Sequence, residues 1–176
     1  MFDVAMGSFD GAEVCDLVGL FILSKLENEF GADNVGLYRD DGLALINSAT
    51  GRDADIARKR LHEIFREIGF KITAQVNHQI VNFLDITLNL NDGKVTPYRK
   101  PGNKPLYINS RSNHPPSIVR QIPKSINRRI SSLSSDQQSF DKCKSLYEDA
   151  LRHSNHDSQL NYSENCSTKS PISKRK

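Results

Sequence analysis

The spacing of apolar residues changes from helical to extended within the first part of the chain. Dense apolar positions from 12 to about 29 predict a helix that is buried on most of its circumference. Asp10 and Glu13 have the spacing of a capping box at the start of that helix. Two short apolar runs follow, over 35–37 and 43–46, with polar residues between them. These runs predict two strands joined by a tight turn.

A second helix is predicted after the hairpin. Apolar residues recur at helical spacing up to 68, Thr50 or Asp53 stands at a capping position, and Gly69 ends the helix.

Three strands are predicted between 72 and 98. Alternating residues predict a strand over 72–76, and apolar positions over 80–90 predict a longer one. The turn residues Asn91-Asp92-Gly93 join that longer strand to a partner over 94–98. Antiparallel pairing is therefore expected in this part of the chain.

The last third of the chain predicts helices and then a tail. Two prolines at 115 and 116 open a helix that Pro123 interrupts, and helical patterns continue over 125–133 and 140–151. The element order predicts an α+β fold with an appended helical lobe. Residues 153–176 have almost no apolar side chains, so we expect a disordered tail.

Composition places the chain among ordinary soluble proteins, since 37% of its residues are hydrophobic and 26% are charged. No apolar run approaches the roughly 20 residues that span a bilayer, and Asp3 stands where a secretory signal would carry positive charge. Cys15, Cys143 and Cys166 lack metal-ligand spacing, so we expect reduced thiols, with Cys15 in the core. We therefore expect an intracellular protein, nuclear or cytoplasmic, that does not act in a membrane.

Charge is unevenly distributed, because the stretch from Gly93 to Ser135 holds nine basic residues and no acidic one. The basic residues are Lys94, Arg99, Lys100, Lys104, Arg111, Arg120, Lys124, Arg128 and Arg129. A run of one sign favours a polyanionic partner, most simply the phosphate backbone of nucleic acid. The same run would suit an anionic membrane, although the amphipathic helix and aromatic anchors of that class are missing from its pattern.

Candidate chemistry lies in the hairpin turn, where Asp40 and Asp41 are adjacent. Two carboxylates at the tip of a hairpin are hard oxygen ligands of the kind that suit Mg²⁺, and two-metal sites of this type drive in-line phosphoryl transfer. On these residues alone, simple turn chemistry is the favoured interpretation, because Asp and Gly are common in hairpin loops.

Four motifs in order resemble the reverse transcriptase of retroelements, especially Penelope-like elements, over about residues 4 to 150. Tyr38-Arg39-Asp40-Asp41 between two apolar strands is similar to the Tyr-X-Asp-Asp signature of that palm. Upstream, the stretch from Val4 to Ser8 before an apolar helix resembles the family's preceding motif. Downstream, the stretch from Phe83 to Leu88 resembles the hairpin that grips the primer, and the stretch from Ser112 to Pro115 with its basic helix resembles the start of a thumb.

This resemblance implies an RNA-directed DNA polymerase with a palm over 1–100, a basic thumb-like segment over 101–152 and the tail. Asp40 and Asp41 would bind Mg²⁺ or Mn²⁺ and be catalytic, while Gly7, Ser8 and Tyr38 would lie against template or nucleotide. Phe83 and Leu84 would lie by the primer. The duplex backbone would be tracked by Arg99, Lys100, Lys104, Arg111, Arg120, Lys124, Arg128 and Arg129. The implied partners are an RNA template, a DNA primer and deoxynucleotides.

The sequence departs from the family pattern at its start, where Met1 stands directly before the Gly-Ser motif. The family's fingers and the strand with a third metal carboxylate would precede that motif, so we expect little or no activity from this chain alone. Asp10 also adds negative charge beside the expected nucleotide position. The alternative is a non-catalytic nucleic-acid-binding module that acts through residues 94–129. A phosphodiesterase that uses the same aspartates is a third reading, with no other support.

Overall fold

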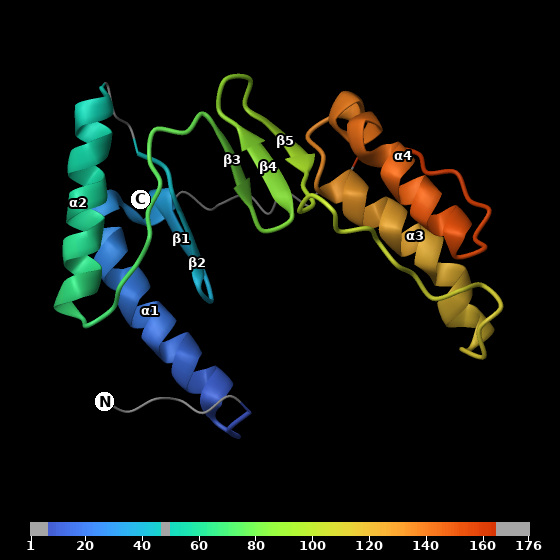
Figure 1. Cartoon of the computed structure of the whole chain (residues 1–176), viewed down its shortest axis with the longest axis horizontal. Coiled ribbons are helices and arrows are strands. Elements are labelled where there is room, and N and C mark those ends of the chain that lie inside the picture. The colour runs from blue at the N-terminus through green and yellow to red at the C-terminus, as the bar shows by residue number, and fades with distance from the viewer. Residues whose placement is uncertain (1–6, 47–49, 165–176) are drawn as a thin grey trace, which may run out of the picture. The chain divides into compact units, whose positions relative to one another are not determined.

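The computed structural model describes residues 7–46 and 50–164 and divides into two compact units, Met1–His78 and Gln79–Lys176 (Figure 1). It combines α-helices with small antiparallel sheets, so the expected α+β class is confirmed. The division falls after His78, whereas the boundary predicted from the sequence lies at 100. Strands 80–97 join the second unit because they pack against its last helix, and the backbone N–H of Ser135 donates to the carbonyl of Val95 at 3.0 Å.

The first unit is a two-helix layer on one face of a hairpin (Figure 1). Its elements are α1 (Gly11–Phe30), the short 3-10 helix η1 (Ala32–Asn34), β1 (Val35–Tyr38), β2 (Asp41–Ala44) and α2 (Gly51–Glu67). Ile22 and Leu26 of α1 and Ile64 of α2 form its buried core, against which Val35 and Leu37 pack. Among the described residues of this unit, the hairpin is therefore packed on one face.

Helix ends in this unit follow local chemistry. The hydroxyl of Thr50 accepts from the backbone N–H of Asp53 at 3.3 Å, and the carboxylate of Asp53 accepts from the N–H of Thr50 at 3.0 Å, which makes a capping box at the start of α2. The expected box at Asp10 is wrong, because its side chain forms no cap hydrogen bond. Gly31 and Gly69 follow α1 and α2 with φ of 91° and 84°, a conformation that glycine adopts without steric cost.

Helix α1 is less buried than its composition predicts. Leu17, Leu20 and Phe21 are exposed by 66%, 62% and 54%, and Cys15, expected in the core, is exposed as well. Only the face that meets α2 and the hairpin is covered, because the described part of this unit places no second layer against the other side of the helix.

The second unit is a three-stranded antiparallel sheet with two helices. Its elements are β3 (Ile80–Phe83), β4 (Ile86–Asn89), β5 (Lys94–Pro97), α3 (Pro116–Ser132) and α4 (Gln137–His153). Residues 72–76, expected as a strand, form no regular element. The single strand expected over 80–90 is two strands, because Leu84 and Asp85 form a turn with Leu84 at φ 52°. Helix α3 continues through Pro123 rather than breaking there.

The core of this unit lies between α3, α4 and the chain after α4. Ile126 and Ile130 of α3 pack with Phe140, Tyr147 and Leu151 of α4, and Leu160 completes the cluster. Leu160 is 1% exposed and lies in the segment predicted to be disordered. That expectation is wrong for residues 153–164, which pack against the helices, while residues 165–176 lie outside the described part of the chain.

Candidate functional site

The aspartate pair lies at the tip of the β1–β2 hairpin, as the sequence predicts. Tyr38 pairs with Asp41 across the strands, so Arg39 and Asp40 alone form the turn. Arg39 has φ 54°, a conformation that costs a residue with a side chain roughly 1–2 kcal/mol. Asp40 is therefore the second turn residue, and Asp41 is the first residue of β2.

The two faces of the hairpin differ. Val35 and Leu37 point toward α1 and α2, and their cross-strand partners Ala44 and Gly42 share that face by the alternation of strands. Tyr38 and Asp41 share the opposite face and are exposed, with Tyr38 at 54%. Asp41 is thus presented on the uncovered face of the hairpin, next to Asp40 at its tip.

Both aspartates have free carboxylates within the described structure. Neither forms an ion pair with a described residue. The neighbouring guanidinium of Arg39 instead lies over the Tyr38 ring, 5.9 Å from its centroid. The donor set fits part of a Mg²⁺ or Mn²⁺ site, because hard carboxylate oxygens are the preferred ligands of these ions. Residues 7–46 and 50–164 bring no third His, Cys, Asp or Glu to the pair.

Gly7 and Ser8, expected near template or nucleotide, lie just before α1. Gly7 has φ 87°, and the carbonyl of Ser8 accepts from the N–H of Gly11 at 3.2 Å. The hairpin runs back alongside α1 from its C-terminal end (Figure 1). Helix α1 is about 30 Å long and β1 about 13 Å, so the hairpin tip falls short of these two residues.

The expected primer-contact residues Phe83 and Leu84 stand at the β3–β4 turn of the second unit. Phe83 ends β3, and Leu84 is 43% exposed at the first turn position. The next residue, Asp85, was predicted to have no catalytic role. Its carboxylate accepts from the guanidinium of Arg129, which ties the turn to α3.

Several expected nucleic-acid contacts are engaged within the protein. Besides Arg129, Lys94 pairs with Asp136 at 2.8 Å. Arg99 lies over the Tyr147 ring, 5.8 Å from its centroid, and its Nε donates to the carbonyl of Asn103 at 3.1 Å. These side chains hold the sheet and its following loop to the helices, so they are less free to meet a ligand.

The remaining cations of the basic run are free in the described structure. Arg120, Lys124 and Arg128 are exposed on α3 and follow one another at intervals of four residues. Residues at that spacing lie on one helix face, each about 6 Å further along the axis. No described carboxylate pairs with any of the three. We call Arg120, Lys124 and Arg128 the basic stripe. The other three cations, Lys100, Lys104 and Arg111, are also exposed and form no ion pair with a described residue.

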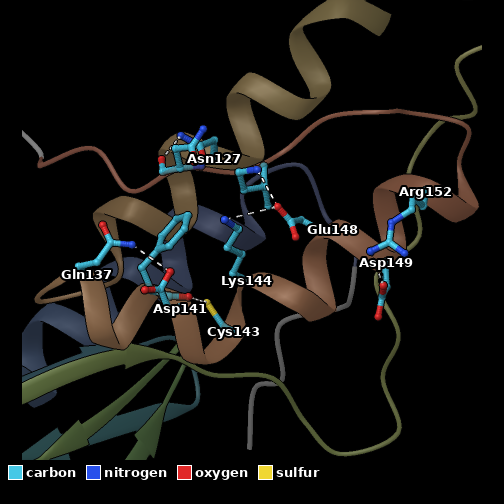
Figure 2. Close-up of polar contacts among 11 residues, drawn as sticks. Asn127, Gln137, Asp141, Cys143, Lys144, Glu148, Asp149 and Arg152 are labelled. Atoms are coloured by element: carbon cyan, nitrogen blue, oxygen red, sulfur yellow. Dashed lines mark hydrogen bonds and ion pairs between the residues drawn. The ribbon is translucent and has the colours of Figure 1, made fainter.

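The docking of segment 154–163, which we call the strap, was not predicted from the sequence pattern. Figure 2 shows Asn127 and Glu148, the two side chains that hold its far end. Asn127 donates to the carbonyl of Asn161 and accepts from its N–H, both at 2.8 Å. Glu148 accepts from the backbone N–H of Leu160 at 2.9 Å and lies 3.8 Å from Lys144.

The near end of the strap is held by the loop before α3. The ring Nε2 of buried His156 donates to the carbonyl of Ile108 at 2.8 Å, and the Ser154 hydroxyl donates to the carbonyl of Tyr107 at 3.2 Å. Leu160 and the ring pair Tyr162–Phe140 were the apolar signals in a polar stretch that could have indicated docking.

The thiol at Cys143 is unsuited to nucleophilic chemistry. Burial raises its pKa to about 11, and its sulfur donates to the carbonyl of Phe140 at 3.1 Å. It therefore stays protonated near neutral pH, and packing explains its position.

In comparisons with known proteins, no protein-family model, no curated protein and no solved structure matches the chain. Within the described residues, no helix combines the length and the hydropathy required to span a bilayer.

Proposed function

We propose that this chain is part of an RNA-directed DNA polymerase, with a metal-binding hairpin in its first unit and a nucleic-acid grip in its second. The observation that carries the proposal is the hairpin register. Tyr38 pairs with Asp41, which puts two carboxylates without an ion pair to any described residue at and beside the tip of a helix-backed hairpin. The order of motifs that resembles a reverse transcriptase adds to this geometry.

In this proposal Asp40 and Asp41 would hold Mg²⁺ or Mn²⁺, which supplies charge neutralisation for a primer hydroxyl attacking a nucleotide phosphate when it is bound. Two carboxylates on an exposed tip hold such an ion weakly, since hard cations take six or more oxygen ligands. We therefore expect low turnover from a site with these ligands alone. Tyr38 shares the uncovered face with Asp41 and offers a ring against which a primer end can pack.

The grip is the basic stripe on α3. Its cations face outward without carboxylate partners in the described structure, which leaves their charge available to phosphates. We expect Arg129 to contribute less, because its guanidinium is paired with the Asp85 carboxylate. The structure thus offers a matched pair of neighbours, Arg128 free and Arg129 engaged.

The test measures extension and binding separately. Primer extension on an RNA template with Mg²⁺ or Mn²⁺ compares the wild type with Asp40→Asn, and with Asp33→Asn as an exposed aspartate elsewhere in the same unit. We expect weak extension that Asp40→Asn abolishes and Asp33→Asn retains. Extension that survives Asp40→Asn would reject the hairpin as the catalytic site.

Binding to the same primer–template is followed by fluorescence anisotropy across a salt series. A plot of log K against log salt concentration becomes less steep by about 0.9 when one phosphate contact is lost. We expect that change for Arg128→Gln and not for Arg129→Gln. Equal effects of the two variants would show that general charge, and not the stripe, governs binding.

A second candidate function is a non-catalytic nucleic-acid-binding module. It is favoured by the absence of a third metal ligand beside the aspartates within 7–46 and 50–164, together with the free stripe in the other unit. Salt-dependent binding that responds to Arg128→Gln, with no metal-dependent extension by the wild type, would show that the chain alone has only this binding function.

A further inference from the structure

The strap and helix α3 line an open polar pocket of about 440 Å³ in the second unit. From α3 the walls include Lys124, Asn127 and Arg128, and from the strap they include Ser158, Gln159 and Asn161. None of the described lining residues is acidic. The pocket thus combines two cations with neutral hydrogen-bonding side chains, which is the chemistry that recognises an anion rather than an apolar ligand.

The geometry points to a binding site for one backbone phosphate of a nucleic-acid strand, with the strap as the second wall. This inference rests on the proposed nucleic-acid ligand and assigns a new part of the protein to it. Nothing in the sequence motifs includes the strap, which begins after the basic run ends.

The strap is built to hold its position. Both polar groups of the Asn127 side chain are used by the backbone of Asn161, so Asn127 positions the strap and leaves the ligand to its neighbours. Glu148 holds the N–H of Leu160, and the Ser131 hydroxyl accepts from the N–H of Ser163 at 3.3 Å. A wall fixed at several points in succession loses little freedom when a ligand binds.

The basic stripe extends beyond the pocket, which favours a polymeric ligand over a small anion. Lys124 and Arg128 line the pocket, while Arg120 precedes Lys124 by one turn on the same face and lies outside the lining. A cation about 6 Å further along the helix does not contribute to binding a single phosphate in the pocket. It can bind another phosphate of a strand that presents phosphates in series.

The experiment introduces a negative charge on the strap, where it would repel a bound phosphate. Gln159→Glu adds a carboxylate to the pocket wall, and Gln138→Glu makes the same change at the start of α4, outside the lining. Gln138 accepts from the ammonium of Lys94 at 3.2 Å, a contact that Glu preserves. Binding of a labelled primer–template is measured by anisotropy from 50 to 200 mM salt, with a thermal melt of each variant.

We expect Gln159→Glu to weaken binding about threefold or more at low salt and Gln138→Glu to weaken it much less, because only the former faces the bound phosphate. Gln159→Glu and Arg128→Gln act on the same phosphate, so the double variant should bind more tightly than the product of the single losses predicts. A merely structural strap would give additive losses and a lowered melting temperature.

Equal binding by Gln159→Glu and Gln138→Glu would overturn the pocket while leaving the grip of the stripe in place. An absence of nucleic-acid binding by the wild type would overturn both the pocket and the proposed function. A lack of primer extension alone would count only against the polymerase, because the anisotropy measurement does not depend on catalysis.

Discussion

Replacing Leu160 by Ala tests whether the strap is part of the folded unit. Leu160 is 1% exposed and packs with Ile126, Ile130 and Phe140, so the change removes three buried carbon atoms. Their transfer from water is worth about 0.8 kcal/mol each, and the cavity left behind adds to the loss. We expect the free energy of unfolding to fall by about 3 kcal/mol. The hydrogen bond from the Leu160 N–H to Glu148 belongs to the backbone and is kept by Ala.

The assay is urea unfolding followed by tyrosine fluorescence. The chain has no Trp, and four of its five Tyr residues lie in the second unit, so the signal reports mainly on that unit. Leu106→Ala is the matched control, since Leu106 is 89% exposed and its truncation should change the stability by less than about 0.5 kcal/mol.

A Leu160→Ala variant as stable as Leu106→Ala would refute the docked strap. It would mean that the polar composition of the segment prevails and that residues 154–163 stay undocked in solution. The inferred phosphate pocket would then lack its second wall.

Two further predictions concern single contacts. The ion pair with Lys94 and the hydrogen bond from the N–H of Ser139 lower the pKa of Asp136 from its ordinary value near 3.8 to about 2. The ionised carboxylate therefore stabilises the fold above about pH 4, and this contribution is lost as the pH falls toward 2. Asp136→Asn keeps a helix cap and should flatten the melting temperature between pH 4 and pH 2; an unchanged pH dependence would contradict this reasoning. Arg39→Gly should relieve the positive φ at the hairpin turn but also remove the contact of Arg39 with the Tyr38 ring. We expect a net rise of about 0.5 kcal/mol in the free energy of unfolding of the first unit, measured by circular dichroism during urea unfolding. Destabilisation by this variant would show that the turn is not strained.

Local sequence patterns were sufficient to predict the features that depend on residues close together in the chain. The hairpin around Asp40 and Asp41 was predicted because two apolar runs with a polar centre leave one good arrangement. The second helix was predicted for the same reason, because Thr50 and Asp53 cap it from within their own turn. The turn between β3 and β4 was implied by the resemblance but not predicted from the local pattern, because Leu84 adopts a positive φ without the Gly or Asn that marks such turns.

The role of each cation was decided by tertiary structure. In the sequence Arg128 and Arg129 are equivalent neighbours, but one helix step turns their side chains by about 100°. Arg129 meets Asp85, which lies 44 residues earlier in the chain, while Arg128 has no ion pair with any residue that the structure describes. Charge composition predicted a basic segment, and only the tertiary contacts with Asp85 and Asp136 showed that Arg129 and Lys94 are neutralised.

By itself, the sequence determined the α+β class, the aspartate hairpin and the basic run, because each depends on composition or on residues close together in the chain. The strap was decided by the tertiary structure alone. One leucine in a polar stretch carries almost no compositional signal, yet it fills a site that two helices create between them, and side chains from both helices hold the backbone around it. The helices must already be packed before that site exists, so the pattern of residues 154–163 could not predict it.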